Sequence, residues 1–231
     1  MQPELQTVTT GYGSVATTPE SQKVLRNTYM LLALTMVPTV IGAYLGIQFA
    51  PVMMASPFMT MIVMLASVIG LQFAIIRYRD SVIGIGLLLL MTFLLGAFLG
   101  PMLNVALQMR NGMQLVGYAA AGTGVIFFGM GTLAATIKRD LAPMGKFLFV
   151  GMLALLVAMI ANMFLQIPAL ALTISSLVIV VFSLYLLYDL NRIIRGGETN
   201  YVMATTAVYI SLLNIFSSLL QLLMALGGEK D

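Results

Sequence analysis

Seven stretches of about twenty or more mainly apolar residues divide this chain, and they constrain its fold more than any other feature. An α-helix rises 1.5 Å per residue, so about twenty residues cross a hydrocarbon core of roughly 30 Å. Only 8% of the residues are charged, and the mean hydropathy is +1.02, whereas a soluble domain carries about 25% charged residues. The sequence therefore predicts an all-α integral membrane protein with seven spans, at approximately residues 24–47, 56–76, 82–107, 113–137, 145–165, 168–190 and 203–226.

The connections between these stretches are short. They carry Pro51 and Pro57, residues 77–81, 110–112 and 138–145, Pro168, and residues 192–200. None can hold a second domain, so we expect one seven-helix transmembrane domain over residues 23–231. Residues 1–22 contain neither a basic residue nor an apolar core, which argues against a secretory signal. Their Thr, Ser, Gly and Pro content predicts a flexible cytoplasmic tail.

The lysines and arginines predict the orientation, because they are enriched in short cytoplasmic loops. With the N-terminus in the cytoplasm, only Arg110 and Lys230 fall on the other side, and seven spans place the C-terminus there. The cytoplasmic set is Lys23, Arg26, Arg77, Arg79, Lys138, Arg139, Lys146, Arg192 and Arg195.

The residue types that are absent restrict the chemistry. Without cysteine or histidine, the chain has no thiolate, no disulfide and no imidazole base or metal ligand. The 19 methionines show no ligand spacing, so we interpret them as flexible apolar filler and expect no copper–thioether site. The glycine-rich 11–16 follows no strand, which argues against a nucleotide loop. We therefore expect no enzyme, no cofactor, no resident metal and no nucleic-acid partner.

Polar side chains form a stripe on the last predicted span. Its members, at helical spacings of i, i+3, i+7 and i+10, are Ser211, Asn214, Ser218 and Gln221. Such side chains must face other helices or an aqueous cavity. Two interpretations stay open: hydrogen bonds that hold the bundle together, or a permeation path.

Small residues mark two predicted packing surfaces. The third span carries Gly96, Gly100, Asn104 and Gln108 at four-residue spacing, with Pro101 beside them as a predicted kink. The fourth span carries Gly117, Ala121 and Gly124. Small residues spaced in this way let two helices approach closely.

Asp189 is the one carboxylate within a predicted span. Arg192 follows three residues later, and the i, i+3 spacing allows a local ion pair. The alternative is a pair with Arg77, at the end of the second span. A paired Asp189 would be ionised, whereas a low-dielectric site without a partner favours the neutral acid. A carboxylate balanced between these two states would suit a proton or cation gate.

Four segments carry a resemblance to a known family: "VLRNTYMLLALT" (24–35), "LGPMLN" (99–104), "ANMFLQIPALALTIS" (161–175) and, above all, "YDLNRIIRGGETNYVMATTAVYISLLNIFSSLL" (188–220). From about Lys23 onward the chain resembles the transmembrane Bax-inhibitor family, and in particular its bacterial YccA-type branch. The family implies six helices around a central seventh, which would place the polar stripe at the centre of the bundle.

The resemblance implies two alternative functions. Some family members carry two aspartates that share a proton and gate a slow calcium leak; Asp189 matches the first, but Ser211 stands in place of the second. This weakens the expectation of a calcium site, although Asp189, Ser211 and Asn214 could still line a polar cavity. The YccA-type branch implies binding to the membrane-anchored AAA+ protease FtsH in the bacterial inner membrane, and restraint of that protease. A purely structural membrane protein is the third interpretation.

Overall fold

The computed structural model describes residues 18–227. Residues 1–17 of the predicted tail lie outside the described residues. Residues 18–227 form helices without any strand. The helices are α1 (Pro19–Ala55), α2 (Pro57–Tyr78), α3 (Val82–Phe98), α4 (Gly100–Leu107), α5 (Gly112–Thr136), α6 (Met144–Leu165), α7 (Pro168–Ile194) and α8 (Tyr201–Gly227). Six are long and apolar enough to cross a membrane alone, and α3 with α4, bent by 40°, can form a seventh span.

α1 is longer than predicted at both ends. It begins at Pro19, where the Thr18 side chain accepts a hydrogen bond from the Ser21 N–H (3.2 Å), so residues 19–22 of the predicted tail are helical. The prediction that Pro51 lies in a connection is wrong, because α1 continues through it to Ala55. Membrane helices tolerate internal proline where neighbouring groups satisfy the freed backbone. Its 37 residues correspond to about 55 Å of helix, more than a bilayer core needs.

The predicted kink in the third span is confirmed. α3 ends at Phe98, and α4 begins at Gly100 with Pro101 in its first turn. Proline lacks an N–H, and its ring crowds the preceding turn, so the helix bends where Pro101 enters.

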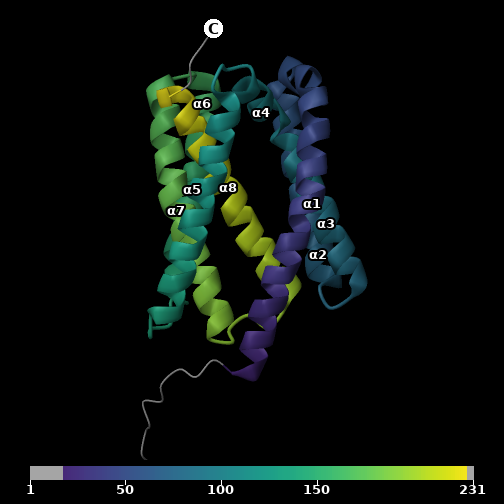
Figure 1. Cartoon of the computed structure of the whole chain (residues 1–231), viewed down its shortest axis with the longest axis vertical. Coiled ribbons are helices and arrows are strands. Elements are labelled where there is room, and N and C mark those ends of the chain that lie inside the picture. The colour runs from purple at the N-terminus through teal and green to yellow at the C-terminus, as the bar shows by residue number, and fades with distance from the viewer. Residues whose placement is uncertain (1–17, 228–231) are drawn as a thin grey trace, which may run out of the picture.

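The helices form two groups joined by α8 (Figure 1). One group contains α1, α2, α3 and α4, and the other contains α5, α6 and α7. α8 crosses diagonally between them and contacts every element except α6, which packs against α7 alone. The described structure therefore does not reproduce a complete ring of six helices around α8. Large apolar side chains such as Val40, Phe73 and Phe128 point outward, as a bilayer allows.

A seam of four glycines holds the first group together. Gly42 and Gly46 of α1 lie against the backbone of α3 at Phe93 and Ala97, and Gly96 and Gly100 lie against the backbone of α1 at Thr39 and Gly46. An added Cβ at any of the four would overlap backbone atoms of the opposite helix. The prediction that Gly96 and Gly100 permit close helix packing is confirmed, and their partners on α1 complete what we call the glycine seam.

The second predicted packing surface is wrong for contacts within this chain. A Cβ added at Gly117 or Gly124 of α5 would meet nothing within 4 Å, and Ala121 is exposed. The helices that contact α5 are α4, α7 and α8, and they lie against other faces of it. We call Gly117, Ala121 and Gly124 the open ladder.

Candidate functional site

The nine predicted cytoplasmic lysines and arginines lie near the start of α1 and in or beside the α2–α3, α5–α6 and α7–α8 connections. These parts lie at one end of the molecule (Figure 1), which we call the basic end. The start of α1 and the end of α8 lie at opposite ends of the molecule (Figure 1), as an odd number of spans requires. The opposite end is closed by a hydrogen bond from the Asn111 side chain, between α4 and α5, to the Gly227 carbonyl of α8 (2.7 Å).

The α7–α8 loop is built around two glycines. Gly196 has a φ of +74°, a left-handed conformation that glycine adopts without the penalty of a Cβ. Its N–H donates to the Ile193 carbonyl (3.1 Å), and the Gly197 N–H donates to the Arg192 carbonyl (2.9 Å). These bonds end α7 and turn the chain back, so that Glu198 lies beside Arg192.

This turn gives Arg192 a partner other than Asp189. The Arg192 guanidinium lies 3.4 Å from the Glu198 carboxylate, and its Nε donates to the Gly197 carbonyl (3.2 Å). Asp189 is partly buried on α7 and forms no ion pair or hydrogen bond within residues 18–227. Arg77 is exposed at the end of α2, and α2 does not contact α7. Neither predicted ion pair of Asp189 is therefore present in the described structure.

Asn200 ties the α7–α8 loop to the α2–α3 connection. Its side-chain oxygen accepts from the N–H groups of Val202 and Met203 (both 3.0 Å), which caps the start of α8. Its side-chain nitrogen donates to the Asp80 carboxylate (2.7 Å) and the Arg79 carbonyl (3.2 Å). One side chain therefore joins both helix groups at the basic end.

The end of α7 also holds the α5–α6 connection. The buried Asn191 accepts from the Leu141 N–H (3.2 Å) and donates to the Arg139 carbonyl (3.4 Å). Arg195 donates to the Ile137 carbonyl (3.4 Å). Together with the bonds of Asn200, these bonds link the α2–α3, α5–α6 and α7–α8 connections at the basic end.

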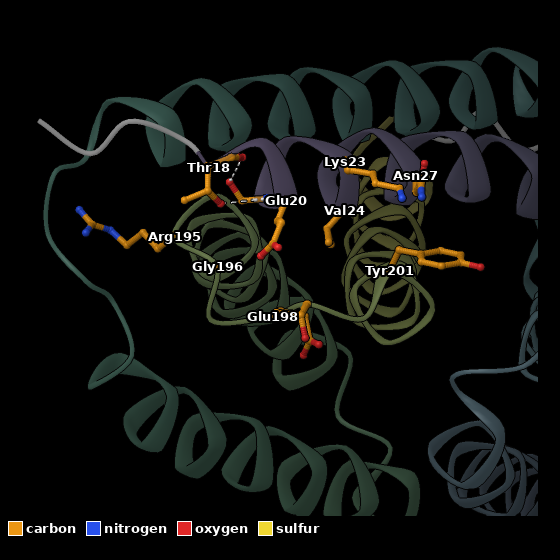
Figure 2. A pocket seen from close by; sticks show the side chains of 11 residues that line it. Thr18, Glu20, Lys23, Val24, Asn27, Arg195, Gly196, Glu198 and Tyr201 are labelled. Atoms are coloured by element: carbon orange, nitrogen blue, oxygen red, sulfur yellow. Dashed lines mark hydrogen bonds between the residues drawn. The ribbon is translucent and has the colours of Figure 1, made fainter.

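A polar cavity of about 580 Å³ opens between the first turns of α1 and the α7–α8 loop. Its charged lining residues are Glu20, Lys23, Arg195 and Glu198. Figure 2 shows the Glu20 side chain extending from α1 toward the loop that carries Glu198. Thr18, the residue that caps α1, is also among the lining residues.

The predicted polar stripe points inward but meets a different cavity. Asn214, Ser218 and Gln221 line a space of about 350 Å³ with residues of α4, α6 and α7, and Gln221 accepts a hydrogen bond from Ser175 of α7 (2.6 Å). Ser211 is buried, yet neither Ser211 nor Asp189 is among the lining residues. The five predicted site residues, Asp189, Ser211, Asn214, Arg77 and Arg192, therefore do not form one cavity. Within residues 18–227, no three carboxylates gather at a place suited to a metal ion.

Sequence reasoning missed a buried tyrosine. The Tyr209 hydroxyl of α8 lies 2.7 Å from the Thr39 hydroxyl of α1, and it also donates to the Thr92 carbonyl of α3 (3.3 Å). This contact lies beside the glycine seam and joins it to α8. A tyrosine hydroxyl deep in an apolar span needs a hydrogen-bond partner. Its position in the span therefore could have indicated a polar contact between α8 and another helix.

Comparison with known proteins matches nearly the whole chain. The family model described as "Inhibitor of apoptosis-promoting Bax1" matches residues 21–228. A relative from Escherichia coli K12 named "Modulator of FtsH protease YccA" is 38% identical over 88% of this chain and 90% of its own length. An uncharacterised protein from Neisseria meningitidis is 40% identical over 94% and 97%, and an uncharacterised membrane protein from Vibrio cholerae is 37% identical over 91% and 92%. The predicted resemblance is confirmed, and this multi-pass membrane protein belongs to the Bax inhibitor family.

Proposed function

We propose that this protein resides in the bacterial inner membrane, where it binds the AAA+ protease FtsH and restrains it. The observation that carries the proposal is the 38% identity, over nearly the full length of both chains, to a relative named as a modulator of that protease. The proposed role is that of a bound partner and not of an enzyme.

The geometry supports a mechanism of slow extraction. A protease that engages the N-terminal residues pulls first on α1, because α1 begins at Pro19. α1 is also the helix that packs backbone to backbone through the glycine seam, and it contacts α2, α3, α4, α7 and α8. Pulling α1 away must open these interfaces at once, so the protease would hold a substrate that it degrades slowly.

The orientation is part of the proposal. FtsH-type proteases act from the cytoplasm, so the basic end and the N-terminus should face that side, as the distribution of lysine and arginine favours. Reporter fusions after Asp231 should be active only on the extracytoplasmic side. A fusion that reports a cytoplasmic C-terminus would contradict both the orientation and the seven spans.

Co-purification tests the partnership directly. Tagged protein solubilised from native membranes should bring down FtsH, and a variant lacking residues 2–17 should recover less of it and survive longer in cells. That deletion keeps Thr18, which caps α1, so the bundle should stay folded; an unchanged melting temperature checks this. The matched control lacks residues 228–231 at the other end and should behave as the wild type. Absence of FtsH from the wild-type eluate would contradict the proposal.

A second candidate function is a pH-sensitive proton or calcium leak gated at Asp189. One observation favours it: a partly buried carboxylate lies near the end of α7 without an ion pair in residues 18–227. Liposomes containing the wild type should show little calcium flux, because Ser211 replaces the second acid. Ser211→Asp should make any flux depend on pH, and Asp189→Asn should remove that dependence. Strong pH-gated calcium flux from the wild type would place the leak ahead of protease binding.

The central position of the last helix is likewise proposed for the protein in a bilayer. Its contacts with six of the other seven elements support it. Because the chain has no cysteine, the pair Met159→Cys and Ser217→Cys would be the only thiols; both positions line the cavity between α6 and α8. If α6 completes a ring of six helices around α8 in native membranes, the two cysteines should oxidise efficiently to a disulfide. Failure to form the disulfide would mean that α6 does not pack against α8.

A further inference from the structure

Four methionines gather in one pocket at the end of the bundle opposite the basic end. The pocket has a volume of about 330 Å³ and lies where α1 turns into α2, against the α3–α4 junction. Its eight lining residues are Met53, Met54, Pro57, Thr60, Met61, Met64, Phe98 and Pro101. Methionine supplies 19 of the 231 residues of the chain but four of these eight lining residues, so the pocket is strongly enriched in methionine. In the sequence the methionines show no ligand spacing, but the fold brings these four together.

Local structure fixes the backbone of the pocket. Met53 and Met54 lie in the last turn of α1, and the Thr60 hydroxyl of α2 donates to the Met53 carbonyl (2.9 Å). The Thr60 N–H donates to the Ser56 carbonyl (3.0 Å), which starts α2 immediately after the turn. Met61 and Met64 are three residues apart on α2, a spacing that places two side chains on one helix face. The four methionines therefore line the pocket from two helices, which the hydrogen bond from Thr60 to Met53 joins.

One wall of the pocket is formed by the α3–α4 junction, and the pocket's methionine side chains are flexible. Phe98 is the last residue of α3 and Pro101 lies in the first turn of α4, so this wall lies at the bend between the two helices. Met53, Met61 and Met64 are partly buried, and Met54 is 48% exposed. Methionine has three rotatable bonds and a polarisable sulfur, which lets several sulfurs turn toward one point in an open pocket.

The donor set determines which ion could bind. The pocket offers thioethers and one hydroxyl but no carboxylate, so hard divalent ions such as Ca²⁺ and Mg²⁺ find no suitable ligands. Thioethers are soft ligands that select Cu(I). Because the chain contains neither cysteine nor histidine, any soft-metal site in it must use methionine. A monovalent ion also brings less charge into an apolar site than a divalent one does.

We propose that Met53, Met54, Met61 and Met64 form a binding site for a monovalent soft cation, Cu(I) or its non-redox analogue Ag(I). With the N-terminus in the cytoplasm, the site opens at the extracytoplasmic surface. Binding involves no change of oxidation state. It is independent of FtsH, of the basic end and of Asp189.

Silver binding by the purified full-length chain in detergent tests the site. Native mass spectrometry and calorimetry with Ag(I) in chloride-free buffer should show one ion bound per chain, with no comparable binding of Ca²⁺ or Zn²⁺. The double variant Met61→Leu and Met64→Leu keeps apolar volume and removes two of the four proposed ligands. It should lower the affinity for Ag(I) by more than about a hundredfold, because damage to the outer partners of a metal site alone costs about ten- to a hundredfold. Wild-type protein that binds no Ag(I) would overturn the proposal.

A matched control distinguishes the pocket from methionine in general. Met30 and Met113 are 67% and 73% exposed and lie outside the pocket. The variant Met30→Leu and Met113→Leu should bind Ag(I) as the wild type does, and both double variants should melt at the metal-free wild-type temperature. Equal loss of affinity in the two double variants would mean dispersed thioether binding and would also overturn the site. If the pocket variant melts early, Met64→Leu alone decides: it should weaken Ag(I) binding, and unchanged binding would contradict the proposal.

Discussion

The glycine seam and the open ladder are alike in sequence and opposite in structure. Both place small residues three or four apart on an apolar helix. In the seam, each glycine lies so close to the backbone of the opposite helix that no Cβ fits, whereas Gly117 and Gly124 face open space. The spacing therefore indicates that a helix can be approached closely, but it does not identify the helix that approaches.

The difference follows from what surrounds each surface. The seam joins α1 to the α3–α4 junction and is continued by Tyr209, whose hydroxyl contacts both α1 and α3. On α5, the residues that meet α8 and α4 lie on other faces, such as the buried Leu115 and Ala119. Without a hydrophobic driving force in lipid, close packing and hydrogen bonds decide which helices associate, and the seam has both.

The largest expected effect is at the contact between Gly100 and Gly46 in the seam. Gly100→Ala would drive a Cβ into the backbone of Gly46, which no side-chain rotation relieves. We expect a loss of about 3 kcal/mol of stability, seen as a melting temperature lower by about 6–12 °C in detergent. The control is Gly86→Ala, also in this group, where an added Cβ meets nothing within 4 Å. Equal melting temperatures for the two variants would show that α1 and the α3–α4 junction do not pack this closely.

The next effect concerns the contact that extends the seam to α8. Tyr209→Phe removes the hydroxyl that bonds Thr39 and the Thr92 carbonyl, while Thr39 keeps its bond to the Thr35 carbonyl (2.7 Å). We expect a loss of about 1–2 kcal/mol, measured by thermal unfolding. Tyr118, which is 62% exposed, supplies the control variant Tyr118→Phe, which should leave stability unchanged. If Tyr209→Phe melts at the wild-type temperature, then the hydroxyl of Tyr209 does not stabilise the packing of α8 against the seam.

Much of the fold could be predicted because bilayer thickness dictates the length of each span. The expected ranges 113–137 and 203–226 became Gly112–Thr136 and Tyr201–Gly227. The prediction was wrong at Pro51, because a membrane helix can continue through a proline that would end a helix in a soluble protein. The candidate site was less predictable. Arg192 is three residues from Asp189, but the turn at Gly196 and Gly197 brings Glu198 to it instead. The distance between α2 and α7 is a tertiary property that no local spacing contains.

The open ladder should respond to alanine with the opposite sign. At Gly117, a new methyl group meets nothing within 4 Å, and alanine favours helix over glycine by about 0.8–1.0 kcal/mol. Gly117→Ala should therefore raise the melting temperature slightly, and Gly124→Ala should do the same. A loss of stability in either variant would indicate that this face contacts another chain, and crosslinking in membranes would then identify it.

The smallest expected effect is at Gly122 of α5, which is neither as crowded as the seam nor as open as the open ladder. A Cβ there would lie 3.2 Å from the Cδ1 atom of Leu219 on α8, the end of a flexible side chain that can shift by a few tenths of an ångström. The gain in helix propensity, about 1 kcal/mol, should be nearly offset by this crowding, so Gly122→Ala should change stability by less than about 0.5 kcal/mol. The same substitution in a Leu219→Ala background removes the crowding and should show the full gain. The double-mutant cycle therefore measures the contact itself; additive effects would mean that Gly122 faces open space, as Gly117 does.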